Sequence, residues 1–136
     1  MKIFFGILMM VVSLLATDLN VLHNYEEAVQ KAKEENKDIY LLIVSDTCKW
    51  CRKFENTTLQ DDPTINELNK SYVMVALSRD RDTLPKNLYA KRVPKHYFLT
   101  KNEEEIHSFL GCWNPEDFAS FLSDVEIKKK LLRKGK

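Results

Sequence analysis

Residues 39–54 read IYLLIVSDTCKWCRKF, which is a run of six apolar residues, a short polar loop and two cysteines with two residues between them. The run Ile39–Val44 is too short for a typical helix and rich in branched side chains, which favours a strand buried on both faces of a parallel sheet. After the loop, Cys51, Phe54 and Thr58 fall on one side of a helix. The sequence therefore predicts that the cysteine pair lies where a buried strand ends and a helix begins.

A C-x-x-C pair can be a structural crosslink, half of a metal site or a redox centre. Residues three apart share a face in the first helical turn, so Cys48 and Cys51 can reach disulfide distance without unwinding the helix. Because the loop that they close is so short, the bridge restricts the unfolded chain little and adds little stability. We therefore interpret the pair as a reversible, redox-active disulfide.

The predicted helix start favours a thiolate at Cys48. Free backbone N–H groups and the helix dipole stabilise an anion at this place, and Lys49 and Arg52 add positive charge. Cys48 is the predicted nucleophile. Cys51 is the predicted resolving thiol, which attacks the mixed disulfide that Cys48 forms with a substrate.

Metal and haem sites are weaker interpretations of the pair. A tetrahedral zinc site needs three or four ligands, and the other candidates stand at no partnering spacing, namely His23, His96, His107 and Cys112. Covalent haem attachment needs a His directly after the second Cys, where Arg52 stands. The sequence predicts no metal and no cofactor other than the disulfide itself.

The rest of the chain alternates between helical and strand-like patterns, which predicts an α/β fold. Capping residues followed by apolar residues at helical spacing predict helices over 25–36, over 61–70 and from Asn114 onward. Apolar runs predict strands at 72–77, 95–100 and 105–110, the last two as an antiparallel hairpin. Residues 84–91 are expected to form at best a short helix. The sheet should be mixed, with the last helix covering one face.

Residues 1–16 have the pattern of a secretory signal, with Lys2, an apolar run and Ala16 before Thr17. The run is shorter than the roughly 20 residues that a membrane-spanning helix needs. We expect a signal peptide at 1–16, one domain at 17–136, and an exported protein that is soluble once the signal is removed. An uncleaved anchor is the alternative.

Composition excludes several function classes. The three glycines Gly6, Gly111 and Gly135 are too scattered for a phosphate loop, a dinucleotide fingerprint or a Gly-x-Ser-x-Gly turn. The chain has 21 Lys and Arg against 20 Asp and Glu, so its whole surface should not attract nucleic acid. The basic run at 128–136 is interpreted as a solvated helix end, where cations are favourable.

These features together resemble the thioredoxin-like superfamily, specifically its exported single-domain members. The resemblance covers residues 20–125 and is carried by SDTCKWCRKF at 45–54, by Val93-Pro94 before the hairpin, and by Gly111 before the last helix. It implies a thioredoxin fold, with a central mixed sheet flanked by helices on both faces. It also implies that Pro94 is a cis-proline beside the cysteine pair and that the Val93 backbone pairs with a bound substrate strand.

The chain departs from the thioredoxin pattern in three places, namely Thr47 in place of a Trp, Lys49-Trp50 in place of Gly-Pro, and Leu42 in place of a buried acid. Without a carboxylate at position 42, Cys51 needs another base or water to remove its proton. Asp46 is a nearby candidate, although an Asp that caps the following helix is the favoured interpretation.

The sequence also allows an expectation for each of three further side chains. Trp50 is expected to form an exposed apolar lip on which a substrate packs. His96 is expected to be a satisfied or partly exposed histidine of a strand. Cys112 is expected to be a partly buried thiol without a role, with a regulatory or intermolecular disulfide as the alternative.

The predicted function is that of a periplasmic thiol-disulfide oxidoreductase that reduces protein disulfides. A reductase is favoured because the chain is too short to hold the inserted helical domain of periplasmic oxidases. The predicted partners are protein thiols or disulfides and a membrane-bound electron donor or acceptor. The alternatives are a disulfide oxidase or isomerase, a thiol reductant in cytochrome c maturation, and a non-catalytic thioredoxin-fold module that binds proteins.

Overall fold

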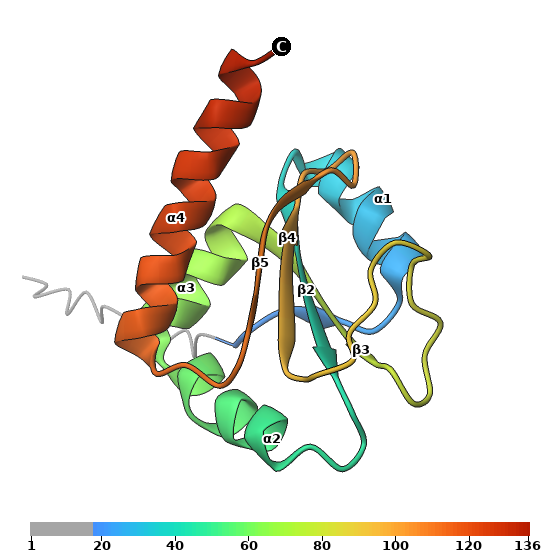
Figure 1. Cartoon of the computed structure of the whole chain (residues 1–136). Coiled ribbons are helices and arrows are strands. Elements are labelled where there is room, and N and C mark those ends of the chain that lie inside the picture. The colour runs from blue at the N-terminus through green and yellow to red at the C-terminus, as the bar shows by residue number, and fades with distance from the viewer. Residues whose placement is uncertain (1–17) are drawn as a thin grey trace, which may run out of the picture.

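The computed structural model describes residues 18–136, so the expected signal peptide and domain start lie outside the described residues. A five-stranded sheet in the order β1-β3-β2-β4-β5 forms its centre (Figure 1). β1 and β2 run parallel to β3, whereas β4 runs antiparallel to both β2 and β5. The strands are Val21–Leu22 (β1), Asp38–Val44 (β2), Tyr72–Ser78 (β3), Lys95–Leu99 (β4) and Glu105–Leu110 (β5).

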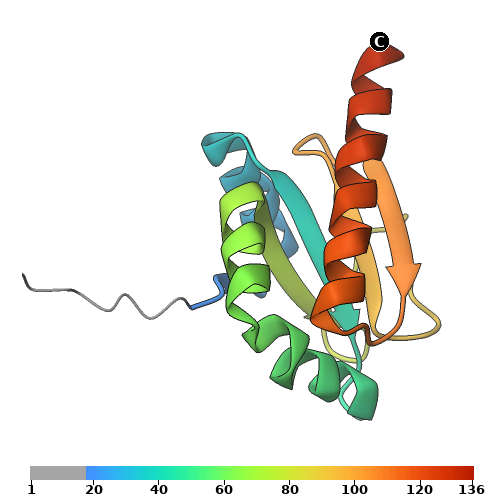
Figure 2. The ribbon, with the colours of Figure 1, turned by 90° about the vertical axis from the view of Figure 1, so that its left-hand side faces the viewer.

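Helices cover both faces of the sheet (Figures 1 and 2). They are α1 (Tyr25–Glu35), α2 (Lys49–Asn56), α3 (Asp62–Ser71) and α4 (Pro115–Lys134), with a 3-10 turn, η1, at Thr58–Gln60. Side chains alternate between the two faces of a strand. Leu41 of β2 accordingly packs in the core under α1, and its neighbours Tyr40 and Leu42 pack in the core under α2, α3 and α4. The predicted mixed sheet with helices on both faces is confirmed.

Three helices begin at the capping residues that the sequence indicated. The side chains of Asn24, Asp61 and Asn114 each accept a hydrogen bond from the backbone N–H three residues later. Each of these bonds satisfies a donor that a helix start would otherwise leave free. Among residues 18–136, no helix is both long and apolar enough to cross a membrane.

No helix forms at 84–91, where at best a short one was expected. The segment holds one turn, in which the Leu88 N–H donates to the Pro85 carbonyl at 2.9 Å. Leu88 and Ala90 are buried, and the Tyr97 hydroxyl donates to the Tyr89 carbonyl at 2.8 Å. Burial of alternate residues and a long-range hydrogen bond therefore hold this loop in place of helical bonding.

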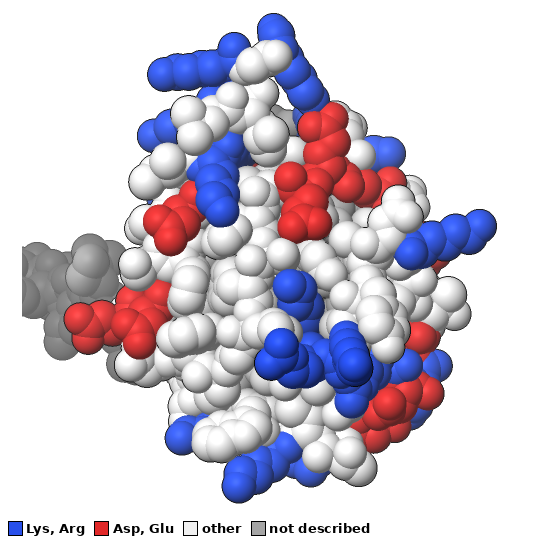
Figure 3. Space-filling view, in the orientation of Figure 1, with Lys and Arg blue, Asp and Glu red and all other residues white. Residues whose placement is uncertain are grey.

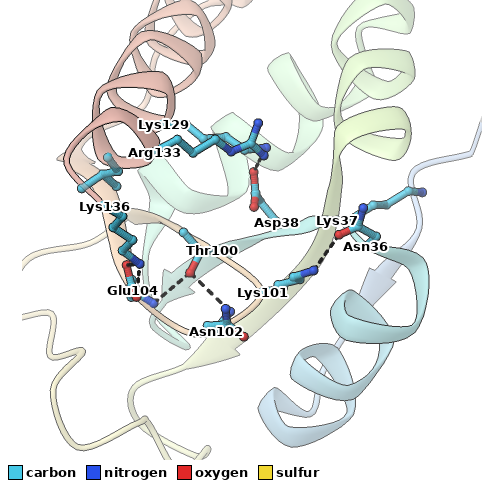
Figure 4. A pocket seen from close by; sticks show the side chains of 11 residues that line it. Asn36, Lys37, Asp38, Thr100, Lys101, Asn102, Glu104, Lys129, Arg133 and Lys136 are labelled. Atoms are coloured by element: carbon cyan, nitrogen blue, oxygen red, sulfur yellow. Dashed lines mark hydrogen bonds and ion pairs between the residues drawn. The ribbon is translucent and has the colours of Figure 1, made fainter.

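The basic run at 128–136 is a solvated helix end, as expected, except at Lys129, which is tied to the start of β2. Lys129 pairs with Asp38, which is only 7% exposed at the start of β2. The Lys136 ammonium lies 2.7 Å from a Glu104 carboxylate oxygen. Figure 4 shows these groups around an open cavity of about 300 Å³ between α4 and the β4–β5 hairpin.

Replacing Lys129 with Met is expected to lower the free energy of unfolding by about 2–4 kcal/mol, because it leaves a buried carboxylate without its cation. Within the described chain, the buried Oδ2 of Asp38 has no donor other than this ammonium. Urea unfolding followed by tryptophan fluorescence measures the loss. The control is Lys130→Met on the exposed side of α4, and equal effects of the two variants would contradict the prediction.

Candidate active site

The two cysteines lie at the junction of β2 and α2. β2 ends at Val44, three residues lead to Cys48, and α2 begins at Lys49. Cys48 is the N-cap of α2, because its Sγ accepts a hydrogen bond from the Cys51 backbone N–H at 3.0 Å. The two sulfurs form a disulfide, with the Cα atoms 5.2 Å apart. The predicted strand-to-helix placement and disulfide distance of the pair are confirmed.

The two cysteines differ in solvent exposure. Cys48 is 9% exposed and Cys51 is 2% exposed. An incoming group therefore meets Cys48 first, whereas Cys51 lies behind it against the core. This order of exposure matches the order in which a nucleophile and a resolving thiol have to act.

The surface around the pair is basic and carries one large aromatic side chain. Trp50 is 52% exposed, and the ammonium groups of Lys49 and Lys53 lie 5.3 and 5.2 Å from its ring centroid. The first turn of α2 has no acidic residue. Figure 3 shows Lys and Arg side chains at the end of the molecule where Figure 1 places α2. This end of the molecule favours an anion at the helix start.

Val93 and Pro94 reach the same end of the sheet from the other side. The Val93–Pro94 peptide bond is cis. Lys95 pairs with Ile43 across β2 and β4, so the residues just before Lys95 lie beside the end of β2 that leads to Cys48. The Pro94 carbonyl accepts a hydrogen bond from the Gly111 N–H at 2.9 Å, which ties this loop to the end of β5.

His96 is a fully buried, satisfied histidine, as expected. Its Nε2 lies 2.8 Å from the Gly111 carbonyl and its Nδ1 lies 2.7 Å from the Tyr40 hydroxyl. Because a carbonyl only accepts, Nε2 carries the proton and the Tyr40 hydroxyl donates to Nδ1. Burial lowers the pKa of His96 to about 4. The neutral ring packs edge-on against Phe54 of α2, with the centroids 4.9 Å apart, and so supports the helix that carries the cysteines.

The expectation that Asp46 caps α2 is wrong. Its carboxylate accepts from the Arg81 Nε at 2.7 Å and from the Ser78 hydroxyl at 2.8 Å, so it joins the loop after β2 to the loop after β3. The Arg81 hydrogen bond, together with that of Ser78, lowers the pKa of the Asp46 carboxyl. The cap of α2 is Cys48 itself. The bonds from Arg81 and Ser78 both reach the Oδ1 of Asp46 and favour its ionised form.

Sequence reasoning missed Glu55 of α2. Glu55 lines a cavity of about 530 Å³ together with Leu42 and His23. Burial raises the pKa of Glu55, and Arg52 and His23 partly oppose the rise. The available signal was its spacing, because Glu55 follows Cys51 by four residues and therefore lies one turn along the same helix face.

Cys112 and the other candidate ligands form no metal centre in the described residues. Cys112 is a half-buried free thiol packed against the core under α4. Residues 18–136 hold no group of three or more His, Cys, Asp or Glu side chains that could bind a metal ion together. The role of Cys112 stays a prediction.

Comparison with known proteins identifies the family to which the chain is similar. The family model Thioredox_DsbH, described as a protein of unknown function, DUF255, matches residues 15–106. The uncharacterized protein B0495.5 of Caenorhabditis elegans is 34% identical over 101 residues, which are 68% of this chain and 14% of that protein. Spermatogenesis-associated protein 20 of Homo sapiens is 34% identical over 119 residues, 79% of this chain and 14% of that protein. The chain therefore matches about one seventh of the length of these two relatives.

Solved structures share the fold. A thioredoxin from Thermus thermophilus has a TM-score of 0.67 at 20% identity, covering 82% of this chain and 89% of that one. A structure named DsbH oxidoreductase has a TM-score of 0.61 at 17% identity, covering 81% and 88%. The expected thioredoxin fold is confirmed, and the Cys48–Cys51 disulfide makes the site like that of a thiol-disulfide oxidoreductase. The chain belongs to the Thioredox_DsbH family of thioredoxin-like proteins.

Proposed function

We propose that this chain is an exported thiol-disulfide oxidoreductase that reduces protein disulfides, with Cys48 as the nucleophile. The observation that carries the proposal is the position of the Cys48 Sγ at the N-cap of α2, where it accepts the Cys51 N–H at 3.0 Å. A donor and a helix N-terminus aimed at a sulfur lower the free energy of its thiolate. The basic surface beside Trp50 supports the same charge state.

The reaction follows from the positions of the two sulfurs. The Cys48 thiolate attacks one sulfur of a substrate disulfide, and the other substrate sulfur leaves as a thiolate. Cys51 then loses its proton and attacks the Cys48 Sγ, which closes the Cys48–Cys51 disulfide and releases the second substrate thiolate. The substrate gains two electrons and the protein loses two. A membrane-bound electron donor is the proposed source of the electrons that restore the dithiol, and no other cofactor takes part.

The proposed substrate surface joins Trp50 to Val93 and Pro94. Trp50 supplies an exposed apolar side chain, and half-buried Val93 lies beside the end of β2. An extended substrate segment can pair with the Val93 backbone while its disulfide meets Cys48. Export is part of the proposal and is supported by the apolar segment that follows Lys2 in the sequence.

Replacing Trp50 with Ala is expected to raise the KM for a protein disulfide about five- to tenfold, because an exposed aromatic contact is a typical source of binding energy. The rate with a small aromatic disulfide should stay within about twofold, since that substrate needs no extended contact. The matched control is Tyr89→Ala, which removes another exposed aromatic side chain, on the loop between β3 and β4. An equal change of KM in both variants would contradict a substrate contact at Trp50.

The reduction potential of the Cys48–Cys51 pair tests the proposed direction of electron flow. The domain without residues 1–16 is equilibrated across a glutathione series, and the fraction of dithiol is counted by thiol alkylation and mass spectrometry. A potential near the thioredoxin value of about −270 mV supports the reductase, and one near about −120 mV indicates an oxidase. A pair with no reversible transition would leave the non-catalytic binding module as the function.

A further inference from the structure

Two segments that meet at the cysteine end of the sheet are rich in cations and contain no acid. Residues 47–54, which hold the cysteines, have three Lys or Arg and no Asp or Glu. Residues 83–102, which run through the loop before β4 and through β4 itself, have five Lys or Arg and again no Asp or Glu. The six cations closest in sequence to Cys48 or to Pro94 form the basic face, namely Lys49, Arg52, Lys53, Lys91, Arg92 and Lys95.

Hydrogen bonds hold the two segments at the same end of the sheet. The backbone N–H of Arg79 donates to the Val44 carbonyl at 3.0 Å, and the Arg79 guanidinium donates to the Lys91 carbonyl. Lys95 begins β4 and pairs with β2. The loop before β4 therefore lies at the end of β2 from which the chain continues to Cys48. Figure 3 shows Lys and Arg side chains both over the start of β4 and over α2.

The cations of the basic face are not neutralised by the protein. Within residues 18–136, the ion pairs involve none of these six side chains. All six are exposed except Lys95, which is half-buried.

The acids nearest to the basic face are bound by groups of their own loops. The Asp46 carboxylate accepts from Arg81, and Asp80 accepts the Asp46 N–H at 2.8 Å. Asp82 accepts a backbone N–H at the end of β3 at 2.7 Å. Glu55, the acid of α2, is half-buried and lines the cavity beside β1 and β3. The basic face is therefore left to attract an anion from solution.

We propose, on the basis of the function proposed above, that the basic face selects protein disulfides whose neighbouring residues are acidic. A substrate strand that pairs with the Val93 backbone passes Arg92 and Lys91, which a strand places within about 7 Å of Val93. The two lysines beside the Trp50 ring meet the same substrate from α2. Acidic side chains at these positions speed the encounter and fix the register of the bound segment.

The position of the cations indicates which anion they serve. They lie around the approach to Cys48, which is 9% exposed, so the anion that profits from them is one that brings a disulfide to this sulfur. An acidic protein segment does so, whereas a lipid surface does not. The attack by the Cys48 thiolate and the transfer of two electrons are those of the proposed reaction. The basic face changes how often a substrate arrives and leaves the balance of the reaction unchanged.

The test uses two synthetic peptides that carry the same intramolecular disulfide, one flanked by Glu residues and the other by an equal number of Lys residues. Each peptide is mixed with the reduced protein, quenched with acid at intervals, and analysed by mass spectrometry for loss of its disulfide. At about 20 mM NaCl the acidic peptide should react at least about tenfold faster than the basic one. At about 500 mM NaCl the two rates should agree within about twofold, because salt screens the attraction.

Charge reversal in the loop before β4 tests the assignment to the basic face. Lys91→Glu combined with Arg92→Glu leaves α2 unaltered and should reduce the low-salt ratio of the two rates to below about twofold, or invert it. The matched control is Lys130→Glu combined with Lys134→Glu, at exposed positions near the end of α4 that lies far from α2 (Figure 1). It changes the net charge equally and should keep the wild-type ratio within about twofold. Because the readout is a ratio, a general loss of activity does not imitate the expected result.

Equal rates for the two peptides at low salt, or an equal change of the ratio in both double variants, would overturn the proposal. Sedimentation with phosphatidylglycerol vesicles tests the competing occupant. Binding to the vesicles that only the Lys91 and Arg92 reversal removes, together with equal peptide rates, would assign the basic face to a lipid surface instead. A wild-type protein that reduces neither peptide at either salt concentration would defeat the proposed function itself.

Discussion

Cys48→Ser abolishes the reduction of protein disulfides, with an expected loss of about a thousandfold or more, because a hydroxyl at the helix start does not supply the thiolate nucleophile. Cys51→Ser has a different result. It leaves the first attack intact and removes the resolving thiol, so a mixed disulfide between Cys48 and the substrate should accumulate. Insulin reduction measures the loss of turnover, and non-reducing electrophoresis with mass spectrometry detects the trapped species.

The third cysteine provides the control for this pair of variants. Cys112 lies in the turn before α4 and is not part of the disulfide. Cys112→Ser should therefore keep the turnover of the wild type within about twofold. Residual turnover in Cys48→Ser, or a mixed disulfide formed through Cys112 in Cys51→Ser, would show that the order of attack assigned to the two sulfurs is wrong.

The second large effect is a loss of stability in acid, which arises from His96. Its pKa is lowered from 6.5 to about 4 in the folded protein by burial. Between about pH 4 and pH 6.5 the unfolded chain therefore binds a proton that the folded domain does not bind. The stabilisation is fully present above about pH 6.5 and is lost as the pH falls toward about 4. Between pH 7 and pH 4 the free energy of unfolding should fall by about 3 kcal/mol through this one group.

Urea unfolding at several pH values measures this dependence. In His96→Gln the amide can still donate to the Gly111 carbonyl and accept from the Tyr40 hydroxyl, but it does not titrate. The variant should be less stable at neutral pH and should lose much less stability on acidification. His107→Gln, on the partly exposed β5, should keep most of the wild-type dependence. A pH dependence in His96→Gln as steep as that of the wild type would contradict the assignment to His96.

Local patterns were enough to predict β2, which leads to the cysteines, and the starts of α1 and α4. The apolar run of β2 and the capping side chains of Asn24 and Asn114 act within a few residues, so their effects can be read along the sequence. β1 had no such signal, since it holds only two residues and exists because Val21 pairs with Met74 of β3. A strand of two residues can be recognised only from the strand with which it pairs.

The environment of the candidate site depended on contacts that sequence spacing does not show. The Asp46 carboxylate binds Arg81, which lies 35 residues further along the chain. Asp46 lies two residues before the N-cap position of α2, and only the fold shows that the Cys48 sulfur is the cap. Glu55 was missed for the same reason. Glu55 meets Leu42 across the cavity only after α2 packs on the sheet.

Gly111 has a consequence for anyone who wishes to transplant this redox centre into another scaffold. The Gly111 N–H donates to the Pro94 carbonyl, and the Gly111 carbonyl accepts from the buried ring of His96. That ring packs against Phe54 of α2. The Gly111 backbone has a φ of +112°, a conformation that residues with a side chain rarely adopt. A graft of residues 45–54 alone would move the cysteines without the support beneath them. The transferable unit is the motif together with Pro94, His96 and this single glycine.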